Sequence, residues 1–145
     1  MKTILVILFL GLPLMAFSQI DAQLSFNKET KKLQLVLENK YNALVLLYPK
    51  RDDDPKKGTY YVVTLKDKNG AIIKEKEDYV FQQGLSRNGD FFIEALSSRN
   101  YTFDLGTWTN SAYWIEVRLH VEARNVTEKI FYVNKEDITK VFLWK

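Results

Sequence analysis

The sequence predicts an all-β protein built as an antiparallel β-sandwich of about 7 to 10 strands. Apolar residues recur with a period of two along most of the chain, which is the pattern of half-buried strands. Short segments rich in β-branched and aromatic residues return about every 8 to 12 residues, with turn residues between them. No segment shows the i, i+3, i+4, i+7 apolar stripe of a helix, and we expect at most one helical turn, near Lys135-Glu136-Asp137.

The N-terminal residues predict a secretory signal peptide over 1–18. Lys2 precedes an apolar run from Ile4 to Leu12, which is too short to span a bilayer, and Pro13 follows it. Ala16-Phe17-Ser18 places small residues at the −3 and −1 positions of a cleavage site between Ser18 and Gln19. We therefore expect residues 19–145 to form one periplasmic or secreted domain; an uncleaved membrane anchor is the alternative.

The composition narrows the classes of partner. The chain has no cysteine, so neither disulfides nor lipid attachment at a cysteine is available. Its net charge of +3 falls to about +2 without Lys2, and the charges are interspersed rather than gathered into the basic stripe that nucleic-acid binding needs. No second apolar run reaches membrane-spanning length, so we expect no nucleic-acid partner and no membrane span after cleavage.

Three strands are expected in the first half of the mature chain. In residues 31–39, Leu33, Leu35 and Leu37 alternate with polar residues and share one face. Residues 43–48 form a continuous apolar run of central-strand length, and residues 59–65 alternate again.

A hairpin follows, because Asn69-Gly70 is a strong turn signal. A two-residue loop would place Leu65 opposite Lys74. A three-residue loop with Gly70 in the left-handed region would place Leu65 opposite Ile73, and the apolar match favours this second form.

Further strands are expected in residues 90–96, 100–105, 113–121, 129–133 and 138–145, each rich in aromatic or β-branched residues. The residues expected in the core are Leu33, Leu35, Leu37, Val63, Leu65, Tyr101, Phe103, Ile115, Val117 and Leu119.

Several of these features resemble the small immunoglobulin-like sandwiches of exported bacterial proteins. Asn39 follows a strand, Asp67 and Gly70 frame a "D-x-x-G" hairpin, and residues 113–117 give a late Tyr-x-x-x-Val strand. The resemblance implies an immunoglobulin-like architecture over most of the mature chain. It implies no activity, because function depends on sites rather than on folds.

The only histidine lies in a row of alternating polar residues, Glu116, Arg118, His120 and Glu122. A nucleophilic triad would need a Ser or Cys beside His120, and the sequence has no cysteine and no strained "G-x-S-x-G" turn. A metal site would need more ligands than one histidine supplies. We expect a solvated strand face with a Glu–Arg ion pair, no catalytic residues and no metal or cofactor.

Two stretches are candidates for partner binding. Arg51, Asp52, Asp53 and Asp54 lie in a charged loop; consecutive acids do not match the alternate spacing of calcium ligands, so the alternatives are a partner contact or a plain exposed loop. Trp108 lies in a Gly/Thr/Asn/Ser loop and Trp114 on the polar side of its strand, where either could anchor a partner or cover the core.

Together these features predict an exported, non-enzymatic binding protein. The first class is a protein-binding module of inhibitor or immunity type, whose partner is a toxin, a hydrolase or an envelope component. The alternatives are a carbohydrate-binding module, favoured by the two tryptophans, and an envelope or adhesion subunit.

Overall fold

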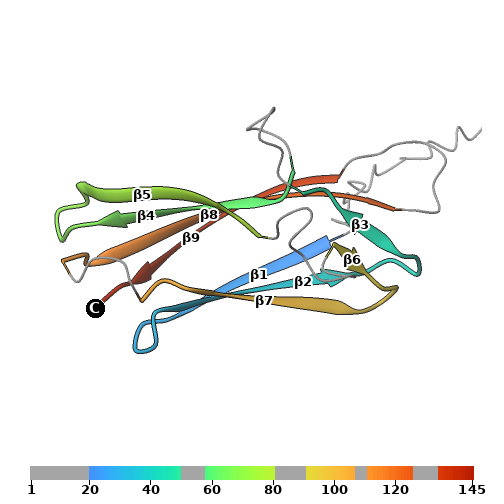
Figure 1. Cartoon of the computed structure of the whole chain (residues 1–145), viewed down its shortest axis with the longest axis horizontal. Coiled ribbons are helices and arrows are strands. Elements are labelled where there is room, and N and C mark those ends of the chain that lie inside the picture. Colours follow the sequence, from blue (N-terminus) through green and yellow to red (C-terminus); the bar gives the residue numbers. More distant parts are fainter. Residues whose placement is uncertain (1–19, 50–57, 81–90, 107–110, 126–133) are drawn as a thin grey trace, which may run out of the picture.

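The protein is a sandwich of two antiparallel sheets, as the sequence predicts (Figure 1). The computed structural model describes residues 20–49, 58–80, 91–106, 111–125 and 134–145. Within these residues lie nine strands and no helix. The smaller sheet has the order β1-β2-β7, formed by β1 (Ile20–Asn27), β2 (Lys32–Asn39) and β7 (Ser98–Asp104).

The larger sheet has six strands and is built around β8 (Trp114–Asn125). Its order is β5-β4-β8-β3-β6, and β9 also pairs with β8. These strands are β3 (Val45–Leu47), β4 (Tyr60–Lys66), β5 (Ile72–Tyr79), β6 (Phe92–Ile93) and β9 (Asn134–Leu143). β8 is the longest strand at 12 residues, and β3, β4 and β9 all pair with it.

Alternation along β8 and β2 builds the core. Ile115, Val117 and Leu119 face inward and are at most 2% exposed, and the three leucines expected from β2 are fully buried with them. Eight of the ten expected core residues are buried; Tyr101 and Phe103 are only partly buried, since they lie on β7, an edge strand of the smaller sheet. Trp144, which was not among the expected core residues, is 1% exposed and stacks on Phe26 at 5.5 Å between ring centroids.

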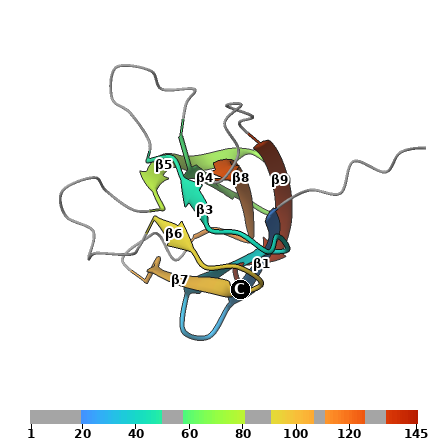
Figure 2. The ribbon, with the colours of Figure 1, turned by 90° about the vertical axis from the view of Figure 1, so that its right-hand side faces the viewer.

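Asn39 joins two of the connections through which the chain crosses between the sheets. Its side-chain amide donates hydrogen bonds to the carbonyls of Ala43, Ile93 and Glu94 at 2.8 to 3.1 Å, and its Oδ1 accepts one from the Tyr41 N–H. The β2–β3 and β6–β7 connections are thereby held together at one end of the sandwich, the end that faces the viewer in Figure 2.

The hairpin between β4 and β5 has the expected three-residue loop, but the expected strand register is wrong. Asp67 pairs with Ala71 through a 2.9 Å backbone hydrogen bond, and Gly70 has φ +87°. Leu65 nevertheless pairs with Lys74 rather than Ile73, because a bulge between Leu65 and Lys66 shifts the register by one residue.

Two other expectations need correction. Residues 135–137 form part of β9 rather than a helical turn, because this segment pairs with β8 along ten residues and tertiary pairing overrides a weak local preference. β1 was not expected, although Ile20, Ala22, Leu24 and Phe26 alternate along it. The strand expected over 129–133 lies outside the described residues.

We expect Val117→Ala to lower the free energy of unfolding by about 2 to 3 kcal/mol, because it removes fully buried methyl groups and leaves a cavity. Val141→Ala is the matched control on the same sheet: Val141 is 57% exposed, so its loss should cost no more than about 0.5 kcal/mol. Equal costs in urea unfolding would contradict the inward orientation of Val117.

Tyr61 links the two sheets and carries a perturbed hydroxyl group. Its ring packs against Phe103 with centroids 4.4 Å apart, and the residue is 5% exposed. Burial raises the pKa of the Tyr61 hydroxyl well above its ordinary value, and the Asp78 carboxylate adds to the rise. The folded protein therefore keeps this proton at a pH where the unfolded chain loses it.

Stability should consequently fall as the pH rises above the unfolded pKa of about 10, by at most about 1.4 kcal/mol per pH unit from this group. Tyr61→Phe should remove this pH-dependent loss of stability. The difference in unfolding free energy between wild type and variant should therefore be constant from pH 7 to 9, and above pH 10 it should shift in favour of the variant. A difference that stays constant to pH 11.5 would contradict the assignment.

Candidate functional site

The structure places one of the six predicted partner-binding residues. Arg51, Asp52, Asp53, Asp54 and Trp108 lie outside the described residues. Trp114 begins β8 and points away from the smaller sheet, on the same side as Glu116, Arg118, His120 and Glu122. We call this surface of β4, β5, β8 and β9 the outer face.

A charged network occupies the middle of the outer face. Lys66 contacts Glu116 at 2.5 Å, and Arg118 lies 3.9 Å from Glu116, which confirms the expected Glu–Arg pair. Arg118 also donates to Glu75 on β5 at 2.8 Å, and Glu75 accepts a 2.7 Å hydrogen bond from the Thr64 hydroxyl. Three strands are thus linked by paired charges, so the guanidinium of Arg118 is already compensated by two carboxylates.

His120 is held between two carboxylates beside this network. Its Nδ1 lies 2.5 Å from Oδ1 of Asp137 on β9, and its Nε2 lies 3.4 Å from Oε1 of Glu122. The Tyr60 ring packs on the imidazole with centroids 5.2 Å apart. The His120 side chain is only 12% exposed, so the expectation of a fully solvated row is wrong at this end of β8.

Glu122 is the most buried member of the row, at 4% exposed. Its Oε2 accepts a 2.8 Å hydrogen bond from the Gly58 N–H, and its backbone carbonyl accepts bonds from the Tyr48 N–H and the Thr59 hydroxyl. A buried carboxylate requires such partners. Glu122 therefore fixes the chain where it leaves β3 and where it returns to begin β4.

Trp114 belongs to an exposed apolar strip at the other end of the outer face. Leu143 lies directly opposite it on β9, and Val141, two residues before Leu143 on the same face, lies opposite Glu116. Leu143 is 42% exposed and Val141 57%, while Trp114 is partly buried, with the Tyr113 ring edge-on at 5.0 Å. Side chains opposite one another on paired strands lie about 5 Å apart, so the three form one surface.

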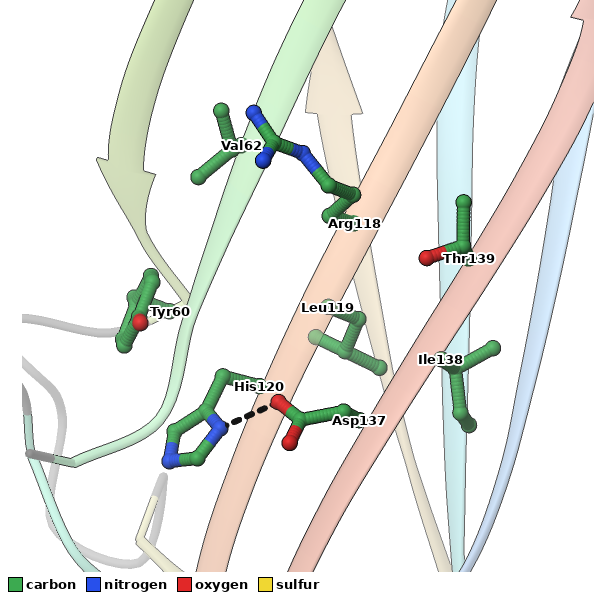
Figure 3. A pocket seen from close by; sticks show the side chains of 8 residues that line it. All are labelled: Tyr60, Val62, Arg118, Leu119, His120, Asp137, Ile138 and Thr139. Carbon is green, nitrogen blue, oxygen red and sulfur yellow. Dashed lines mark hydrogen bonds and ion pairs between the residues drawn. The ribbon is translucent and has the colours of Figure 1, made fainter. Parts of the chain in front are cut away.

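A shallow depression lies between the apolar strip and Glu122. It has a volume of about 270 Å³ and is lined by residues of β4, β8 and β9, among them Tyr60, Val62, His120, Asp137 and Thr139 (Figure 3). The Asp137 side chain is 80% exposed at its rim. Arg118 also borders the depression, with its guanidinium directed toward Val62 (Figure 3).

The outer face combines paired charges, an apolar strip and one imidazole that two carboxylates orient. Among the described residues, no three His, Asp or Glu side chains converge on a position that suits a metal ion. No helix in the described part of the chain is long and apolar enough to cross a membrane.

Comparison with known proteins leaves the family open. No protein-family model matches the chain, and no curated protein is similar to it. A solved structure with some likeness is a penta-heme cytochrome c552 from Thermochromatium tepidum, with 12% sequence identity and a TM-score of 0.36. The match covers 82% of this chain and 39% of the cytochrome chain. The resemblance to exported immunoglobulin-like sandwiches stays a prediction.

Sequence reasoning missed Asp137, Tyr60 and Gly58 as parts of this surface. Asp137 was assigned to a helical turn, and Tyr60 was treated only as a strand residue. Tyr60 and Asp137 meet the row on β8 through strand register, since both pair with His120, and Gly58 meets it through the hydrogen bond to Glu122. Alternation within one segment carries no information about that register.

The burial of His120 changes its expected contribution to stability. The sequence alone predicts that His120→Ala leaves stability unchanged within about 0.5 kcal/mol. With two carboxylate contacts and a packed ring in place, we now expect a loss of about 1 to 2 kcal/mol. Arg118→Ala is the control: this side chain is 49% exposed, and its ion pairs should contribute less than about 1 kcal/mol. Thermal or urea unfolding at pH 7 measures both, and equal losses would show that His120 has no special structural role.

Proposed function

We propose that the protein is an exported, non-enzymatic protein-binding module of inhibitor or immunity type, and that it binds its partner through the outer face. In this proposal residues 1–18 direct export and are removed, and the mature chain acts in the periplasm or outside the cell. The partner is a toxin, a hydrolase or an envelope component. The observation that carries the proposal is the exposed strip of Trp114, Val141 and Leu143 beside the charged network.

This surface has the composition of a protein-binding interface. Such interfaces combine an apolar centre with a polar rim, and aromatic residues anchor them. Here the apolar strip adjoins Lys66 and Glu116. Because Lys66 and Glu116 pair with each other, neither places an uncompensated charge next to the apolar strip.

The fold also favours the outer face as the surface for a protein partner. The apolar strip and the charged network lie on paired strands, which fix their positions more rigidly than loops would. Carbohydrate binding remains the second candidate, since an exposed tryptophan also suits a sugar ring. It is weaker here because Trp114 is partly buried and meets the Tyr113 ring edge-on.

Trp114→Ala tests the proposal. The mature protein is purified from the exported fraction, and its intact mass shows whether the chain is cleaved after Ser18. It is then immobilised to capture partner proteins from periplasm and medium. Affinity for a captured protein should fall by about 2 kcal/mol or more, roughly thirtyfold, at a temperature where thermal unfolding shows that the variant is still folded. Leu96→Ala, which truncates a 69% exposed leucine at the β6–β7 crossover, is the matched control and should bind normally.

Two results would overturn the proposal. A partner that binds the Trp114 variant as tightly as the wild type would place the interface elsewhere. Retention on insoluble polysaccharide that Trp114→Ala abolishes would identify a carbohydrate-binding module instead.

A further inference from the structure

The depression on the outer face combines three features that recognise a positive charge. Its rim carries the Asp137 carboxylate, which is 80% exposed. Oδ1 of Asp137 contacts His120, which leaves Oδ2 to accept a hydrogen bond from a ligand. The Tyr60 ring and the aliphatic Val62 side chain line the opposite side (Figure 3). Aromatic faces attract cations, and apolar walls accommodate the methylene stems of long basic side chains.

The charge already present in the depression does not oppose such a ligand. Arg118 borders it, but its guanidinium bonds to Glu75 at 2.8 Å and lies 3.9 Å from Glu116. The Glu122 carboxylate, which contacts Nε2 of His120, lies on the same side of the sheet. The described groups around the depression therefore carry more negative than positive charge.

The size of the depression limits what can enter. Its volume of about 270 Å³ lies below the range of about 300 to 1,000 Å³ that is usual for small-molecule sites. One long side chain fits it better than a cofactor does. The Trp114 strip lies six residues away along β8, about 20 Å, so one protein partner can contact both.

We propose that this depression receives a lysine or arginine side chain of the partner protein, with Asp137 and Tyr60 as its principal contacts. The inference rests on the proposed function for the nature of the partner, but the recognition of a cationic group stands on the depression itself. His120 acts as a positioning residue, because it holds the Asp137 carboxylate at the rim.

The single histidine provides an unambiguous reporter of occupancy. The full exported chain, labelled with ¹³C, is titrated with N-acetyl-arginine methylamide at fixed pH and ionic strength, and the His120 ring signals are followed by NMR. N-acetyl-citrulline methylamide, which has nearly the same shape without the charge, is the control ligand. We expect saturable shifts with a millimolar Kd for the arginine compound and at least tenfold weaker binding of the citrulline compound.

Two variants test the contacts. Asp137→Asn should weaken binding of the arginine compound about tenfold, whereas Asp104→Asn, which alters an exposed carboxylate on the smaller sheet, should not change it. Thr139→Lys places a resident ammonium group at the depression and should abolish binding while leaving the His120–Asp137 contact in place. Equal binding of the two ligands, or full binding by Asp137→Asn, would overturn the inference.

The experiments distinguish failure of the cation site from failure of the proposed function. If a Trp114-dependent protein partner is found but arginine and citrulline compounds bind alike, the proposed function holds and the cation site fails. If the arginine compound binds as described but no protein depends on Trp114, the cation site holds and the proposed interface fails.

Discussion

The structure depends on one layer of aliphatic side chains that β8 and β2 contribute between the two sheets. Val117, Ile115 and Leu119 meet Leu33, Leu35 and Leu37 in a single buried cluster, and nearly all are fully excluded from solvent. Because the chain has no cysteine, no disulfide assists this layer. Each buried aliphatic side chain contributes about 1.5 to 3 kcal/mol, against the conformational entropy that folding removes. The same alternation that buries one side of β8 presents Trp114, Arg118 and His120 on the other, so the core and the outer face are two consequences of one pattern.

Buried polar side chains stabilise the connections between strands, which the apolar layer does not reach. Asn39 bonds to the β2–β3 and β6–β7 connections between the sheets, and Glu122 bonds to Gly58 just before β4. The backbone groups that these two side chains bind lie where strands begin or end, at the edge of the regular ladder. One side chain that makes several hydrogen bonds at such a point pairs several of these backbone groups at once. Its removal would leave them buried and unpaired, which costs about 1 to 3 kcal/mol of stability for each group. His120 extends this arrangement from Glu122 to the exposed Asp137, so the depression on the outer face is built on a rigid base.

Local patterns predicted the parts of the fold that depend on one segment at a time. Alternation identified β2, β4 and β8 and the sides that they bury, and Asn69-Gly70 identified the three-residue loop with Gly70 at positive φ. The bulge after Leu65 was missed, because a bulge depends on how two strands fit rather than on the turn between them. For the same reason the sequence showed that Trp114 and His120 share a face but not that Asp137, 17 residues later, lies opposite His120. Burial of Glu122 follows from its contact with Gly58, 64 residues away, and no local pattern contains it.

The charges along β5 bear on whether the edge of the larger sheet can pair with another chain. Among the described strands, β5 pairs with β4 alone, and an unpaired strand edge invites pairing with another chain. Its register with β4 places Lys74 and Lys76 on the inward side, beside Leu65 and Val63, and Glu75 and Glu77 on the outer face. Consider two copies of β5 that pair antiparallel about a two-fold axis perpendicular to the sheet, so that each side chain stays on its own face. In the registers with the most paired residues, lysine would then lie opposite lysine and glutamate opposite glutamate. Inward-pointing charges of this kind discourage edge-to-edge association. On the outer face, Lys66 pairs with Glu116 and Arg118 with Glu75 within the sheet, and the side chains of Val141 and Leu143 are exposed beside them.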